Sequence, residues 1–88
     1  MTDDQTNGDE ALALQALGWT LSEDSRAERF LALTGLTPET LRRALSEPAT
    51  LAATLRFLEA HEPDLVACAE AIGVAPDVLP EARRRLEA

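Results

Sequence analysis

The residues best suited to chemistry in this chain are one cysteine and one histidine, Cys68 and His61. Together they could supply a nucleophile and its base, or two ligands of a metal ion. Pro63 lies between them, however, and breaks the helix that would have aligned them. The sequence supplies neither a third group to orient the base nor an evident oxyanion hole. We therefore expect no catalytic residues, no metal site and no cofactor, and we interpret Cys68 as a small buried apolar residue.

Two pairs of neighbouring carboxylates, Asp3 with Asp4 and Asp9 with Glu10, are the next candidates for chemistry. Either pair could be imagined to bind a cation or to act as acid and base. Adjacent residues do not face each other along a helix, so we interpret both pairs as solvated charge. A small-ligand or cation binder that uses acidic residues is the alternative function.

The basic residues are few, and all eight are arginines. Arg83, Arg84 and Arg85 form the one basic cluster, at the end of the last predicted helix, where cations favour the negative end of the helix dipole. A helix-turn-helix nucleic-acid binder would have to read bases from residues 38–45, which offer only Arg42 and Arg43. This third function is the least favoured, and we expect no nucleic-acid partner.

The overall charge of the chain also argues against a nucleic-acid partner. Sixteen acidic residues against eight arginines give a net charge of −8, which disfavours binding to phosphate backbones. Six of those acids lie within the first 24 residues, which contain no basic residue. We predict that residues 1–8 are a disordered acidic tail. The chain has a single cysteine, it does not start with a basic and then apolar leader, and no apolar run approaches ~18 residues. We therefore expect a cytoplasmic protein without a membrane partner.

The elements that must position these residues are all predicted to be helices. Leu and Ala dominate the apolar residues, and residue types typical of strands are scarce. Proline and glycine divide the chain into predicted helices at 9–21, 23–34, 38–45, 48–60, 64–72 and a last one that begins at Pro76 or Pro80. The sequence predicts an all-α protein, a compact orthogonal bundle of five or six short helices, in which residues 9–88 form one domain.

Two of the predicted turns resemble each other. Gly35-Leu36-Thr37-Pro38-Glu39 and Gly73-Val74-Ala75-Pro76-Asp77 agree in residue type at a spacing of 38 residues. This could reflect a duplicated helical hairpin. We favour convergent turn chemistry, because a glycine stop, an apolar residue and a proline restart suit any tight connection between helices.

The first predicted helix has two apolar faces. One face, which we interpret as a core stripe, carries Ala13, Leu14, Leu17 and Leu21, and the other carries Leu12, Ala16 and Trp19. Such a helix is either central to the bundle or offers its second face to a partner. The face made by Leu12, Ala16 and Trp19 is the candidate partner-binding face, because Trp is enriched at interface hot spots.

Three segments carry a resemblance to a known family: Arg29–Arg42, Leu55–Leu58 and Ala71–Val74. In these segments the chain resembles a family of short all-helical alphaproteobacterial proteins classed as a domain of unknown function. The most specific piece is Phe-Leu-x-Leu-Thr-Gly-Leu at residues 30–36. The resemblance implies a compact helical fold and a bacterial cytoplasmic protein, and it implies no established activity.

The function that we expect is a non-enzymatic protein-protein interaction or regulatory module. Its partner would be an unknown protein or a second copy of the chain in a homodimer.

Overall fold

The computed structural model describes the backbone of residues 3–88 and the side chains of residues 8–88. The described residues form six helices and no strand, which confirms the predicted all-α class. The helices are α1 (Asp3–Leu21), α2 (Asp24–Thr34), α3 (Pro38–Arg43), α4 (Pro48–Glu59), α5 (Glu62–Ile72) and α6 (Val78–Glu87). None of these helices combines the length and the apolar character that crossing a bilayer would require.

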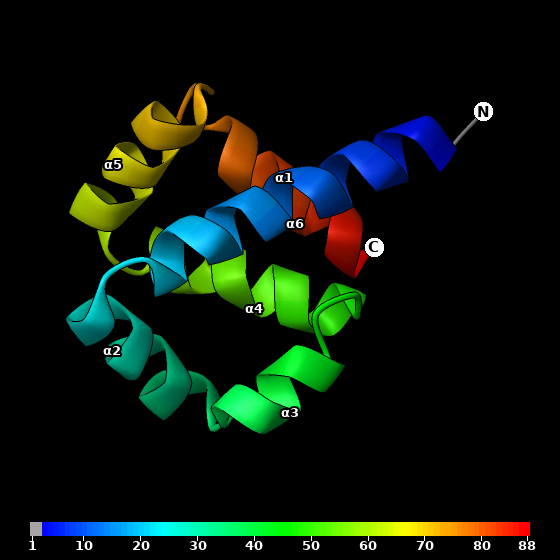
Figure 1. Cartoon of the computed structure of the whole chain (residues 1–88). Helices are drawn as coiled ribbons and strands as arrows, with labels where there is room; N and C mark the ends of the chain where they lie inside the picture. Colours follow the sequence, from blue (N-terminus) through cyan, green and yellow to red (C-terminus); the bar gives the residue numbers. More distant parts are fainter. Residues whose placement is uncertain (1–2) are drawn as a thin grey trace.

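Three helices, α1, α4 and α6, make the centre of the molecule (Figure 1). Each of the three packs against the other two, and α5 packs against α1 and α4. Helix α1, which the sequence predicts to be either central or in contact with a partner, is in contact with α2, α4, α5 and α6. This arrangement explains why α1 carries apolar residues on more than one side.

Helix α1 begins at Asp3, whereas the sequence predicts a start at Asp9. Nothing in residues 3–8 breaks a helix as proline would, and Asp3 and Asp4 fall in the first turn, where carboxylates are favoured. Residues 1 and 2, and the side chains of residues 3–7, lie outside the described part of the chain. The predicted disorder of residues 1–8 stays a prediction.

The buried side of α1 differs from the predicted stripe. Leu14 is 42% exposed, while Ala16 and Thr20 are fully buried. Thr20 tolerates burial because its hydroxyl donates to the carbonyl oxygen of Ala16 at 2.8 Å. The prediction was wrong at Leu14 because a helix that is apolar on several sides does not indicate which of them faces the core.

The end of α1 is stabilised by a side chain from the next helix. Arg26 of α2 donates to the carbonyl oxygens of Trp19 at 2.5 Å and Thr20 at 3.2 Å. These are carbonyls of the last turn, which lack partners within the helix. Its guanidinium carbon also lies 3.6 Å from the Trp19 ring centroid. Arg26 thereby fixes the corner between α1 and α2.

The predicted helix starts at Pro38 and Pro48 are confirmed, and the other predicted starts are shifted by one to six residues. Ser22 does not cap α2; its hydroxyl donates back to Trp19, and Glu23 occupies the N-cap position. Helix α3 ends at Arg43 instead of residue 45, and α5 begins at Glu62 instead of residue 64. Helix α6 begins at Val78, between the two predicted starts at Pro76 and Pro80. Pro80 removes no backbone hydrogen bond from the helix, because the amides of the first turn have no partner within it.

The two similar turns share their backbone conformation. Gly35 and Gly73 end α2 and α5 with φ of 76° and 80°, in the left-handed region that favours glycine. After Gly35 the chain restarts at Thr37, whose hydroxyl accepts from the Thr40 amide at 3.1 Å while Thr40 reciprocates. No such cap forms at Asp77. The likeness is therefore limited to the glycine stop.

The helices are locked together by aromatic packing and ion pairs. Phe30 of α2 meets Phe57 of α4 edge to face, with ring centroids 5.3 Å apart. Arg85 of α6 donates two 2.9 Å hydrogen bonds to the buried carboxylate of Asp9 on α1. The hydrogen bond to Asp9 raises the pKa of Arg85 above its ordinary value. The first and last helices are thus held side by side.

Candidate functional site

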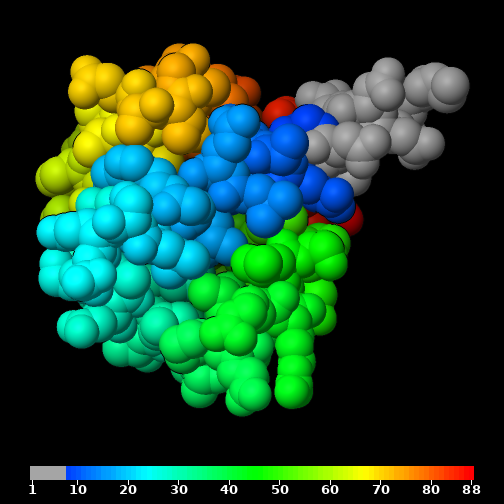
Figure 2. All heavy atoms as spheres, in the orientation of Figure 1, coloured from blue at the N-terminus to red at the C-terminus, as the bar shows by residue number. Residues whose placement is uncertain are grey.

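An apolar groove lies between α2 and α3, and the last residue of α1, Leu21, also lines it. Its volume is about 340 Å³. Six apolar residues line it, Leu21, Ala27, Leu31, Pro38, Leu41 and Leu45, together with the single charged residue Arg42. Figure 2 shows α1, α2 and α3 meeting on one face of the molecule. We call this hollow the α2–α3 groove.

The local sequence explains why the groove stays open. Helix α3 has only six residues, of which Leu41 alone is buried, and it makes few contacts with any other helix. Gly35 turns the chain sharply after α2, and Pro38 starts α3 at once. Helix α3 is therefore packed loosely, and a hollow remains between it and α2.

The charge of the groove is unbalanced. Arg42 is exposed, and it forms no ion pair with any side chain among residues 8–88. The neighbouring Arg43 lies 3.9 Å from Glu39 in an exposed pair. The groove thus offers an apolar floor and one guanidinium that is free to meet an anion.

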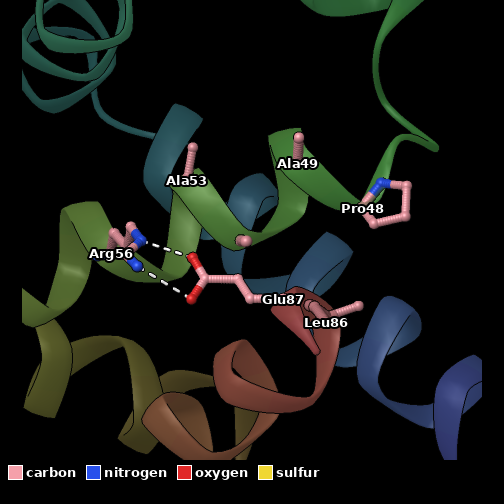
Figure 3. Close-up of a pocket in the computed structure, with 7 residues that line it drawn as sticks. Pro48, Ala49, Ala53, Arg56, Leu86 and Glu87 are labelled. Carbon is pink, nitrogen blue, oxygen red and sulfur yellow. Dashed lines mark hydrogen bonds and ion pairs between the residues drawn. The ribbon is translucent and has the colours of Figure 1, made fainter.

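A second hollow, of about 320 Å³, lies between the start of α4 and the end of α6 (Figure 3). Pro48, Ala49 and Leu86 give it apolar walls. Arg56 reaches across it and donates to both carboxylate oxygens of Glu87, at 2.6 and 3.0 Å. The hydrogen bonds from Arg56 and then from Arg83 lower the pKa of Glu87. The charged groups of this hollow already satisfy each other.

A third hollow, also of about 320 Å³, shares Ala53 and Arg56 with the second one. It is bordered by Leu33, which is 71% exposed, and by Phe57. Because its one charged residue is the Arg56 already bound to Glu87, it offers a ligand little beyond apolar contact.

The predicted partner-binding face is not brought together as one surface. Ala16 is fully buried in the core. Leu12 and Trp19 are half-buried and pack against the core cluster. Arg26 also covers part of the Trp19 ring. Ala16 therefore cannot touch a partner while α1 stays packed, and partner contact by Leu12 and Trp19 stays a prediction.

Cys68 and His61 are placed as structural residues. Cys68 is fully buried, and burial raises the pKa of its thiol to about 11, so the reactive thiolate is scarce at neutral pH. His61 is exposed, and its Nδ1 lies 3.0 Å from Asp64, which also receives a hydrogen bond from Arg29. Neither Cys68 nor His61 lines any of the three hollows.

The interpretation of Asp9 as solvated charge was wrong. Its side chain is buried because Arg85, 76 residues later in the chain, binds both carboxylate oxygens. Arg83 likewise donates to Glu59 of α4 at 2.5 Å. The side chains of Asp3 and Asp4 lie outside the described residues. Within the described part of the chain no group of three or more His, Cys, Asp or Glu residues gathers as metal ligands would.

Sequence reasoning missed the α2–α3 groove. Its apolar residues come from three helices, and periodicity within one helix cannot show which residues of separate helices adjoin. One signal was present, since a six-residue helix with Leu41 and a following Leu45 has more apolar surface than so short an element can bury by itself.

Comparison with known proteins gives a family and nothing closer. No curated protein matches the chain, and no solved structure does. One family model matches residues 7–88, and its description is "Protein of unknown function (DUF3572)". Because this match spans nearly the whole chain, the protein belongs to the DUF3572 family.

Proposed function

We propose that this protein is a non-enzymatic interaction module that binds an apolar segment of a partner protein in the α2–α3 groove. The observation that carries the proposal is the groove itself, with six apolar lining residues and a volume in the range of pockets that hold ligands. Interfaces are organised in this way, with an apolar centre that receives anchoring side chains.

The absence of a role for Cys68 and His61 in the hollows supports a binding function over catalysis. The charged residues that line the three hollows are Arg42, Arg56 and Glu87, and Arg56 and Glu87 bind each other. A lone arginine beside apolar side chains can recognise an anion, but it cannot transfer a proton near neutral pH.

The choice between the α2–α3 groove and the predicted face at Leu12 and Trp19 follows from accessibility. The groove is open in the folded chain, whereas Ala16, the middle residue of the predicted face, is buried. We therefore place the partner in the groove.

The test is a selection of random 20-residue peptides displayed on phage against the wild-type protein. Peptides that are enriched are then measured by fluorescence anisotropy on wild type and on Ala27→Trp, in which an indole fills the groove. We expect Ala27→Trp to weaken binding by at least tenfold. Ala32→Trp is the matched control, since Ala32 is an exposed residue of the same helix that does not line the groove.

Both variants must first show the helical circular dichroism and cooperative melting of wild type. Equal binding to wild type and to Ala27→Trp, or no enriched peptide at all, would refute the proposed function.

A further inference from the structure

Most arginines of this chain form ion pairs with its own carboxylates. Six of the eight form ion pairs within the described residues: Arg26, Arg29, Arg43, Arg56, Arg83 and Arg85. Only Arg42 and Arg84 have no such pair among side chains 8–88. One of these two, Arg42, lines the α2–α3 groove. The charge that remains for a partner to meet is therefore predominantly acidic.

Two acidic residues on the α2 side of the groove form no ion pair with a described side chain. Asp24 and Glu28 are exposed, and neither is in an ion pair with another described side chain. At 3.6 residues per turn, both fall within an arc of about 100° of α2 that also holds the lining residues Ala27 and Leu31. The groove is thus bordered by two carboxylates along α2 and by the Arg42 guanidinium on α3.

The secondary structure limits what kind of segment can bind there. The described residues contain no strand, so they offer no sheet edge to which an extended peptide could add. A groove between two helices instead accepts the apolar face of a third helix, which presents side chains at every third or fourth position. Helix α2 has 11 residues and would lie beside about three turns of such a helix.

From these observations we propose that the partner segment is an amphipathic helix with basic residues along the edge that faces Asp24 and Glu28 and an acidic residue that faces Arg42. This proposal rests on the proposed function, because it names the partner of the same groove. Complementary charge on the two edges would fix the direction of the bound helix as well as its affinity.

A second copy of this chain is a poorer occupant. Each copy carries a net charge of −8, so the association of two copies brings like charges together. Two of the described helices are net basic, α3 and α6. Helix α3 is itself a wall of the groove, and α6 has Leu79 and Ala82 buried in the core, so neither has a free apolar face to offer.

The experiment uses the peptides selected on wild type as probes. We expect the enriched sequences to show Leu-type residues at helical spacing, with Lys or Arg enriched on one flank. Binding is then measured by fluorescence anisotropy at 150 mM salt on the double variant Asp24→Lys/Glu28→Lys. We expect affinity to fall at least tenfold.

The matched control is the double variant Glu70→Lys/Asp77→Lys, which changes the net charge by the same amount at exposed positions near the α5–α6 connection, far from α3 (Figure 1). We expect it to change affinity less than threefold. In addition, Arg42→Glu should weaken the peptides that carry an acidic residue opposite, and a Lys at that peptide position should restore binding.

Each result separates the two proposals. Peptides that lose binding on Ala27→Trp but show no basic flank, or that respond equally to the two double variants, would overturn the charged-helix proposal and leave the proposed function standing. A dimer in sedimentation equilibrium that Ala27→Trp dissociates would also overturn it, since the occupant would then be a second copy. Peptides indifferent to Ala27→Trp would refute both.

Discussion

The hollow between α4 and α6 and the groove between α2 and α3 are nearly equal in size, about 320 and 340 Å³, yet they differ in what their charged groups lack. Arg56 and Glu87 satisfy each other across the first. Arg42 in the second has no anion among the described side chains. The difference teaches that two hollows of nearly equal volume can differ in what they offer a ligand: the first has its charged groups paired, and the second has a guanidinium unpaired among the described side chains, beside an apolar floor.

Helices α4 and α3 also differ in how tightly they are packed. The prediction with the largest expected effect tests this difference. Leu55 is fully buried in the central helix α4, so Leu55→Ala should lower the free energy of unfolding by about 3 kcal/mol. Leu41→Ala, in the loosely packed α3, should lower it by about 2 kcal/mol, at the low end of the range for a buried leucine, because its surroundings can collapse more easily. Urea unfolding followed by circular dichroism measures both. Equal losses would mean that α3 is packed as firmly as α4.

The contact between α1 and α6 gives the next effect. Asp9→Asn removes one charge from a buried carboxylate that holds Arg85, and we expect the melting temperature to fall by about 5 °C. Glu10→Gln is the matched control, since Glu10 has no ion pair among the described side chains. It should leave the melting temperature within about 1 °C. A similar fall in both variants would argue against the clamp.

The turn that positions α3 can be tested at Gly35. Gly35→Ala forces a side chain into the left-handed region and should cost about 1 kcal/mol, although no atom lies within 4 Å of the added methyl group. Gly18→Ala, in the last turn of α1 and equally free of neighbours, should instead stabilise the protein by about 0.5 to 1 kcal/mol. Opposite signs in thermal unfolding would establish that backbone conformation decides the outcome.

The smallest effect concerns Glu87 and its dependence on pH. Its pKa is lowered in the folded state by Arg56 and Arg83, so the native state binds fewer protons than the unfolded state. The resulting stabilisation is complete above the unfolded value near 4.5 and is lost as the pH falls through the folded value. Glu87→Gln should therefore lower the urea midpoint more at pH 7 than at pH 2.5. Glu70→Gln should show no such dependence.

Much of the fold could be predicted because its signals are local. Gly35, Pro38 and Pro48 mark ends and starts of helices through their own backbone chemistry, and the structure has them in those roles. The less local features could not be predicted in this way.

The charged contacts show where sequence reasoning stops. Asp9 and Arg85 are 76 residues apart, and nothing in either neighbourhood indicates that they meet. The three arginines at residues 83–85 are adequately explained by the helix dipole alone, and this explanation concealed the pairs to Glu59 and Asp9. The α2–α3 groove was missed for the same reason, because its residues converge only after three helices have packed.

The central position of α1 has a consequence during protein synthesis. Of the six described helices α1 is made first, yet two of its principal neighbours, α4 and α6, come later, and α6 is made last of the six. At typical translation rates, roughly 3 to 13 s separate the emergence of Leu21 from that of Glu87. For that interval the apolar sides of α1 have no permanent cover. The core is therefore completed only after α6 has left the ribosome.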